Sequence, residues 1–178
     1  MPRLPIVIVP DERLITRASE VQEIDDKIKE LVNDMFETVN HANGFGLAAV
    51  QVGVLKRIFV TSIPEEYQED QYPGYQSTGF FCMINPEITA LSDEHVILKE
   101  GCLSIPEQSY EIKRPKYLTV KYRDLNNEEQ VTKADGWLAR CIQHELDHLN
   151  GILYIRHLSK LKYDIAMKKA QKIKKQAV

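Results

Sequence analysis

Apolar residues recur at steps of three and four residues in the part of the chain that follows an extended, proline-punctuated lead-in at residues 1–18. This spacing places them on one face of an α-helix and predicts an amphipathic helix from about Ser19 to Asn40. Asn43 and Gly44 follow and mark its end. The residues that carry the pattern are Val21, Ile24, Ile28, Leu31, Val32, Met35, Phe36 and Val39.

Shorter apolar runs further along the chain predict strands. The polar stretch between the first two runs, residues 62–78, predicts a long surface loop. Pro86 is expected to stop the strand before it, because proline cannot donate to a sheet ladder. The last three runs, separated by turn-forming residues, predict an antiparallel meander. The predicted strands are residues 57–60, 80–85, 95–98, 110–113, 118–122 and 128–132.

A second helical pattern begins near Asp135 or Gly136 and is stopped by Gly151, and a basic segment at residues 160–175 predicts a final helix. No internal repeat or linker divides the chain. These elements predict an α+β fold in which mostly antiparallel sheets pack around the second helix. The apolar positions of that helix are Leu138, Cys141, Ile142, Leu146 and Leu149.

The composition limits the classes of function. With 178 residues, 43% hydrophobic and 28% charged, the chain is expected to form one catalytic domain, residues 1–178, that ends in a basic helix at residues 160–178. A net charge of -3 gives no case for DNA binding. The apolar run at residues 4–9 is too short for a signal peptide or a membrane span. Three cysteines, an odd number, favour reduced thiols and a cytoplasmic protein.

Residues 143–148 carry the clearest chemical signal. Helical geometry puts His144 and His148 on one face, with Glu145 about 100° round from His144. Two such imidazoles can hold a metal ion beside a carboxylate that takes a proton, as a metal-assisted hydrolase requires. A His pair can also be solvated helix surface, and His-Glu-x-x-His can arise by chance. The neighbouring apolar positions of the same helix favour the metal site.

Residues 44–53 are rich in glycine and alanine. The pattern Gly44-x-Gly46-x-x-Ala49 meets the loose dinucleotide-binding fingerprint, but it follows a predicted helix and precedes a strand, the reverse of what that fingerprint needs. Two interpretations stay open. The glycines can form a tight turn against the core, or they can let the backbone lie along a substrate while the Gln51 amide faces a developing oxyanion.

Two histidines need a further metal ligand, and Cys102 is the natural third. A thiolate binds a borderline-soft ion strongly, and the turn-like residues 100–104 can present it to the helix. Two histidines and one cysteine leave the fourth position to water, as in catalytic sites. Such a ligand set accepts Zn(II), Fe(II), Co(II) or Ni(II).

These three segments, in this order, closely resemble the motifs of the peptide deformylase family: GFGLAAVQ at 44–51, EGCLS at 100–104 and QHELDHLNG at 143–151, with PDERL at 10–14 and Asn85-Pro86 as further similarities. The resemblance implies removal of the formyl group from the N-terminal formyl-methionine of new bacterial or organellar polypeptides, with release of formate. It implies Fe(II), replaceable by other divalent ions, and Glu145 as general base and acid. The implied metal ligands are Cys102, His144 and His148.

The same positions suggest how a formylated peptide would be held. We expect the Gln51 side chain and the Leu103 backbone N–H to stabilise the oxyanion. An apolar pocket near the helix would take the methionine side chain, although Leu98 and Trp137 can equally be plain core. A glycine-flanked backbone would pair with the peptide as an added strand. The substrate-binding candidates are Gly44, Phe45, Gly46, Leu98, Trp137 and Cys141.

The remaining charged residues are expected to support the fold. Glu100 and Arg114 are expected to form a structural ion pair, and Asp147 either supports a ligand or is helix surface. Ile155-Arg156-His157 stand where the family often has an acidic residue, and the loop at 62–78 looks longer than usual. The histidines that lack partners at ligand spacing, and are therefore expected to be non-catalytic, are His41, His95 and His157.

The lysine-rich tail leaves two interpretations open. It can be a solvated helix face, or, as in bacterial members of the family, a basic C-terminal helix that docks on the ribosome. Two rival functions also stay open: a His-Glu-x-x-His metalloprotease, and a non-enzymatic, metal-stabilised binding module on the ribosome. The protease lacks an obvious downstream ligand in the usual position, and the module would need neither Glu145 nor an open fourth position.

Overall fold

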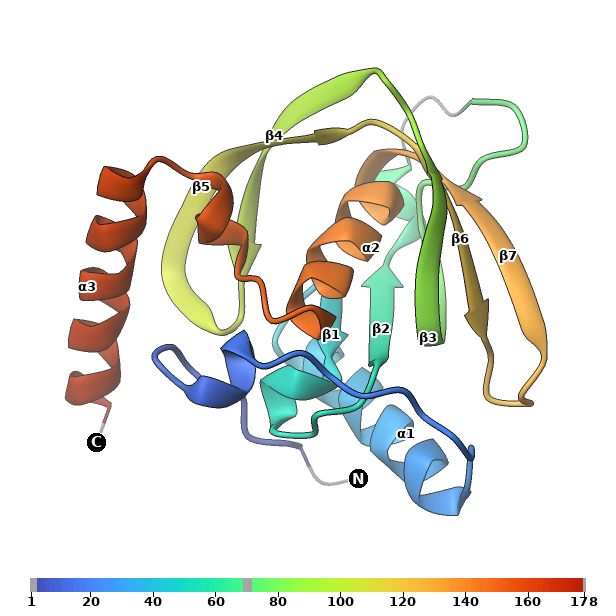
Figure 1. The fold of residues 1–178 in the computed structure, drawn as a ribbon, viewed down its shortest axis with the longest axis horizontal. Coiled ribbons are helices and arrows are strands. Elements are labelled where there is room, and N and C mark those ends of the chain that lie inside the picture. The colour runs from blue at the N-terminus through green and yellow to red at the C-terminus, as the bar shows by residue number, and fades with distance from the viewer. Residues whose placement is uncertain (1–2, 69–71, 178) are drawn as a thin grey trace.

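The computed structural model describes residues 3–68 and 72–177, and within these ranges it contains three α-helices, seven strands and four short 3-10 helices (Figure 1). Residues 69–71 of the predicted loop and residue 178 of the tail lie outside the described residues. The helices are α1 (Asp26–His41), α2 (Gly136–Leu149) and α3 (Lys160–Gln176). The strands are β1 (Gly46–Ala48), β2 (Ile58–Ile63), β3 (Gly79–Leu91), β4 (His95–Cys102), β5 (Ile105–Pro115), β6 (Leu118–Arg123) and β7 (Glu129–Ala134). The 3-10 helices are η1 (Glu12–Ile15), η2 (Ala49–Val52), η3 (Glu65–Tyr67) and η4 (Tyr154–His157).

The strands form two separate antiparallel sheets. Five of them pair in the order β1-β2-β3-β6-β7, and β4 and β5 form a hairpin of their own. Figure 1 shows α2 at the centre of the molecule, with the five-stranded sheet on one side and the hairpin on the other. Helix α3 packs against β5 and η4. The predicted α+β fold, with antiparallel sheets around a central helix, is confirmed.

Helix α2 begins and ends where the sequence predicts. Asp135 is its N-cap, and residues such as Leu138 and Ile142 are fully buried. Gly151 has a φ of 73°, and a Cβ there would lie 2.8 Å from the backbone of Ile15. Glycine therefore ends the helix for two reasons, the left-handed conformation and the close approach of another segment. Among the described residues, no helix combines the length and the apolar character needed to cross a membrane.

Helix α1 begins at Asp26, capped by the Asp25 side chain, so the predicted start near Ser19 was wrong. The segment before it is held by Asn85, whose side-chain amide exchanges hydrogen bonds of 2.8 and 2.9 Å with the backbone of Val21. The apolar residues of this segment still pack against the same core as α1. Their spacing therefore indicated burial correctly and helical conformation wrongly.

Strand β3 continues through Pro86 to Leu91, so the predicted stop at Pro86 was wrong. The register of β3 against β6 shifts between Ile84 and Glu87, and Asn85 has a φ of 50°. A residue at such a bulge is not paired with the neighbouring strand, so the missing N–H of Pro86 breaks no ladder hydrogen bond there. The strand can therefore continue beyond the proline.

The hairpin also differs from the prediction. Strand β4 extends to Cys102, so this residue ends a strand rather than lying within a turn. Strand β5 pairs with β4 and not with β6, so the predicted three-stranded meander was wrong. Strand β2 extends to Ile63, and Ser62 is buried within it, so the polar loop begins two residues later than predicted. Alternation of apolar residues predicts a strand but carries no information about its partner.

Candidate active site

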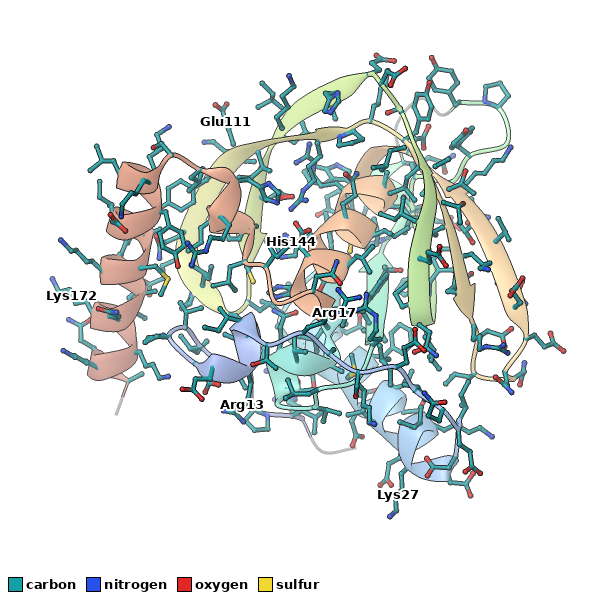
Figure 2. The ribbon with its side chains drawn as sticks, in the orientation of Figure 1. Arg13, Arg17, Lys27, Glu111, His144 and Lys172 are labelled. Carbon is teal, nitrogen blue, oxygen red and sulfur yellow. The ribbon has the colours of Figure 1, made fainter. Side chains whose placement is uncertain are left out.

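The three predicted metal ligands come together beside α2. Cys102 ends β4, and His144 and His148 lie one turn apart on α2. Their ligand atoms lie within 4.8 Å of one another, and Cys102 Sγ is 3.3 Å from His148 Nε2. Figure 2 shows His144 in the interior, between α2 and the hairpin. One thiol and two imidazoles at this separation fit a single divalent ion that keeps an open fourth position.

His144 is supported on the side away from the other ligands. Its Nδ1 lies 3.7 Å from Glu100 Oε2. Its ring also packs on Tyr154, with 5.5 Å between the ring centroids and 33° between the planes. A carboxylate at one ring nitrogen orients the ring and makes the other nitrogen a better metal ligand.

Glu100 lies in a buried cluster of charges. Arg114 Nε donates to Glu100 Oε1 at 2.5 Å, and Arg140 lies 3.4 Å from the same oxygen. Arg114 Nη1 also donates to Asp147 Oδ2 at 2.9 Å. Burial raises the pKa of Glu100, but its contacts with His144 and Arg114 outweigh burial and lower the pKa to about 2. The predicted ion pair is confirmed, and Asp147 belongs to the same cluster.

Glu145 is buried beside the metal ligands. It is 3% exposed, and among the described residues its Oε2 has no hydrogen-bond partner. Burial raises the pKa of Glu145 from 4.5 to about 7. Gly46 makes room for it, because a Cβ at this position would lie 2.6 Å from Glu145 Oε1 and equally close to Cys141 Sγ. A carboxylate oxygen is thus available to accept a proton beside the metal position.

Gln51 connects the β1 side of the site to the hairpin. Its Oε1 accepts the Ala48 backbone N–H at 2.9 Å, and its Nε2 donates to Ser104 Oγ at 3.1 Å. The same Nε2 lies 3.6 Å from Cys102 Sγ. Because the Ala48 N–H holds the oxygen, the Nε2 end of the amide faces Ser104 and Cys102, which is the orientation that an oxyanion donor beside the ligands requires. Leu103 follows Cys102 and lines the adjoining cavity.

A cavity of about 550 Å³ opens at this site, a volume within the usual range for small ligands. The predicted ligand His148 is 1% exposed and is not among the residues that line the cavity. Leu98 does not line the cavity and pairs with Ile112 within the hairpin. The predicted site residues that line it are Gly44, Phe45, Gly46, Gln51, Cys102, Leu103, Trp137, Cys141, His144 and Glu145.

The sequence did not point to the hairpin residues of the lining or to three supporting residues. Ser104 lay inside a quoted motif without a role, and neither Tyr154 nor Arg140 stood out. The buried Arg140 guanidinium donates to the backbone oxygens of Ile112 and Val96, at 2.9 and 2.8 Å, which depends on how the hairpin pairs. The unpredicted lining residues are Asn43, Lys99, Glu100, Gly101, Ile105, Pro106, Glu107, Gln108 and Arg140.

The residues expected to be non-catalytic lie away from the cavity lining. His41 contacts Arg3, and His157 Nε2 lies 2.9 Å from Asp147 Oδ2. Arg156 lies over the ring of Tyr163 on α3, 4.1 Å from its centroid. Residues 155–157, where the resemblance led us to look for an acidic residue, therefore help to attach α3 to the rest of the molecule.

Comparison with known proteins points to one family. The sequence model of polypeptide deformylases matches residues 3–164. The peptide deformylase of Wolbachia pipientis wMel is 81% identical over 172 residues, which cover 97% of this chain and 96% of that protein. The peptide deformylase of Rickettsia typhi is 45% identical over 177 residues, 97% of each chain. The crystal structure of peptide deformylase from Ehrlichia chaffeensis is 50% identical, with a TM-score of 0.94 over 99% of both chains. A crystal structure of the Ehrlichia chaffeensis enzyme in complex with actinonin gives a TM-score of 0.91 at 50% identity, over 97% of this chain and 98% of that one.

Proposed function

This chain belongs to the polypeptide deformylase family, and from that premise we propose which of its residues carry out the reaction. The protein is a metal-dependent hydrolase that removes the formyl group from the N-terminus of nascent polypeptides. Cys102, His144 and His148 have the chemistry and the separation to hold its ion. When bound, the ion supplies a Lewis acid that acidifies water and polarises the formyl oxygen.

Glu145 is the general base and then the general acid. The observation that supports this role is its buried carboxylate oxygen Oε2, which has no partner among the described residues and lies beside the metal ligands. Glu145 accepts the proton of the attacking water and delivers it to the leaving amine nitrogen. The Gln51 amide and the Leu103 backbone N–H donate to the oxyanion that forms at the formyl carbon. The products are formate and a free N-terminal methionine.

The cavity beside the ligands binds the start of the peptide. Trp137 and Cys141 lie on α2, on the same helix as Glu145, and offer an apolar wall to the methionine side chain. Among the described residues, β1 pairs with β2 alone, so the backbone at Gly46 can receive the peptide as a further strand. Leu98 has no part in this proposal because it lies outside the cavity lining.

We assign Fe(II) as the ion in the cell. A site with one thiolate and two imidazoles also accepts Zn(II), Co(II) and Ni(II), and these are expected to substitute in vitro. Fe(II) beside a thiolate predicts loss of activity in air, because oxidation of the ion or of Cys102 destroys the site. Metal analysis of protein purified without oxygen tests the assignment, and a stoichiometric content of another ion with no iron would contradict it.

The experiment that tests the function measures formate release from a formyl-Met peptide by enzyme purified without air and loaded with Fe(II) or Ni(II). We expect no release from the acetylated peptide and no cleavage of internal peptide bonds, which a metalloprotease would cut. Glu145→Gln should keep its metal content and lose about 10²- to 10⁴-fold in turnover. Glu111→Gln, on the outer side of the hairpin in Figure 2, is the control and should remain fully active. A fully active Glu145→Gln enzyme would contradict the assigned role.

We also propose that the enzyme acts in the cytoplasm as one domain, residues 1–178, and that its basic helix at residues 160–178 docks on the ribosome. Helix α3 carries exposed lysines, and Figure 2 shows Lys172 pointing away from the rest of the molecule. A basic face of this kind suits ribosomal RNA. Ala166 and Ala170 on the opposite side of α3 are fully buried, so the helix is part of the core and its deletion would not be a clean test.

Charge reversal tests ribosome docking without removing the helix. The variant Lys168→Glu/Lys172→Glu should bind ribosomes more weakly in co-sedimentation and lose much of the salt dependence of binding. Lys27→Glu/Lys29→Glu on the exposed side of α1 changes the net charge equally and should bind as the unmodified protein does. Equal binding by both variants would remove α3 from the docking surface. Both variants should keep full activity on short peptides.

A further inference from the structure

Three aromatic rings from three different segments meet at one side of the cavity. The Phe45 ring lies edge-to-face against Trp137, with 5.6 Å between centroids and 68° between planes. The same ring also lies edge-to-face against Tyr67, with 4.7 Å between the ring centroids and 73° between the planes. Phe45 and Trp137 line the cavity, whereas Tyr67 contacts Phe45 and does not line the cavity.

The backbone of Phe45 is fixed independently of its ring. Its carbonyl oxygen accepts the Ser62 backbone N–H at 2.7 Å and the Cys141 thiol at 3.3 Å. The residues on both sides of Phe45 are glycines and bring no side chain to pack beside the ring. The Phe45 ring packs against the main hydrophobic cluster, and its ring-to-ring contacts are with Trp137 and Tyr67.

Tyr67 comes from η3, in the polar segment between β2 and β3. This segment is anchored beyond η3, where the Tyr72 backbone N–H donates to Asp135 Oδ2 at 2.9 Å and the Gln76 backbone N–H donates to the Lys133 oxygen at 2.9 Å. Tyr67 is 41% exposed, so one side of its ring faces solvent and the other packs on Phe45. A segment without any of the three sequence motifs thus reaches the cavity wall.

We propose that Tyr67 is a positioning residue for substrate binding: it holds the Phe45 ring against Trp137 and so sets the apolar wall that the formylated peptide meets. The inference rests on the proposed role of this cavity as the peptide-binding cleft. Tyr67 touches neither the metal ligands nor Glu145 among the contacts described above. Its loss should therefore weaken binding of the ground state and the transition state alike, which raises KM and leaves kcat unchanged.

The test compares Tyr67→Ala with Tyr67→Phe in the metal-loaded enzyme. Removal of one edge-to-face contact should raise KM for a formyl-Met peptide by about two- to tenfold, with kcat and metal content unchanged, and Tyr67→Phe should restore KM.

Trp137 is the single tryptophan of the chain, so its fluorescence reports directly on this cluster. Tyr67→Ala should shift the emission, and Tyr67→Phe should not.

Tyr75→Ala is the matched control from the same polar segment. Its ring packs on Tyr72 and Tyr117, with centroids 6.1 and 5.4 Å away, and none of the three lines the cavity. This variant can lower Tm but should keep the KM of the unmodified enzyme. A Tyr67→Ala enzyme with unchanged KM overturns the proposal, whatever its Tm or emission.

Phe45→Ala separates failure of this inference from failure of the proposed function. If Phe45→Ala raises KM and Tyr67→Ala does not, the cleft assignment stands and the role of Tyr67 is wrong. If neither variant changes KM, the peptide does not bind against this wall, and the cleft assignment itself is wrong. Glu145→Gln tests the chemistry independently of both outcomes.

Discussion

On one side of the cavity stands α2, packed against β1 and β2 of the five-stranded sheet; on the other stands the β4–β5 hairpin, which pairs with no further strand among the described residues. We call these the helix wall and the hairpin wall. The helix wall supplies His144 and His148, and the hairpin wall supplies Cys102. The proposed metal site joins the two walls.

The two walls are held in place by different interactions. Fully buried apolar residues such as Leu138 and Ile142 fix the helix wall within the main core. The hairpin wall has a smaller apolar cluster, in which Ile105 and Ile112 pack against α3 and η4. It also contains buried charges, with Arg114 between Glu100 and Asp147. In β5 the Gln108 side-chain amide donates to the α3 backbone oxygen of Ala166 at 3.2 Å. Apolar packing is tolerant of small changes, whereas a buried charge that loses its partner is costly, so the hairpin wall should be the more fragile one.

The largest expected effect comes from Arg114→Met, which leaves Glu100 and Asp147 without their common partner. Breaking such a buried pair should cost about 3–5 kcal/mol in the free energy of unfolding, measured by urea denaturation. Lys116→Met is the control, because its ion pair with Glu94 is 40% and 53% exposed and should contribute at most about 1 kcal/mol. Hydrogen exchange should increase first in β4 and β5. Equal losses from both variants would contradict the comparison.

Metal removal should have the next largest effect, because the ion connects the two walls. At a free ion concentration of about 100 times Kd, binding adds about 2.7 kcal/mol to the free energy of unfolding. Chelation should therefore lower Tm and increase hydrogen exchange around Cys102 more than within the five-stranded sheet. Cys102→Ala should show no such response to chelator. A chelator effect that persists in this variant would place the ion elsewhere.

The Gly46→Ala variant tests the packing of the helix wall, because Gly46 lies against two side chains of α2. The added Cβ would lie 2.6 Å from Cys141 Sγ and Glu145 Oε1, so these side chains must move, at a cost of about 1–3 kcal/mol and with loss of formate release. Gly101→Ala in the hairpin wall is the control, because its Cβ would lie 3.5 Å from the Gln108 oxygen, an ordinary contact. A Gly46→Ala enzyme with full activity would show that the observed position of the Glu145 side chain is not needed.

The smallest effect, one of reactivity and not of stability, concerns the three thiols. Burial raises the pKa of Cys82, within the five-stranded sheet, to about 12, so its thiolate fraction at neutral pH is roughly a thousandfold below that of a free thiol. Cys141 lines the same cavity as Cys102, but it is only 7% exposed and burial raises the pKa of its thiol well above the ordinary value, whereas Cys102 is partly exposed. In metal-free protein, iodoacetamide should therefore modify Cys102 first, as read by peptide mass spectrometry, and bound metal should protect it. Earlier modification of Cys82 would contradict this order.

The predictions from sequence were correct where the information is local. The limits of α2 follow from Asp135, Gly151 and the apolar spacing between them, and the pairing of His144 with His148 follows from one turn of helix. The predictions were wrong where contacts with a distant segment determine the conformation. The Asn85 side chain binds the backbone of Val21, so the segment before α1 is not helical. The bulge next to Asn85 allows β3 to continue beyond Pro86.

The sequence by itself determined the α+β class, the central helix and the three segments that meet at the site, because helical period, strand alternation and motif spacing act within a few residues. The tertiary structure decided that β5 pairs with β4, that Arg114 holds Glu100 behind His144, and that the motif-free segment around Tyr67 reaches Phe45. The physical reason is that an apolar or charged residue reveals only that it needs a partner. Which partner it finds depends on the packing of elements that lie far apart in the chain.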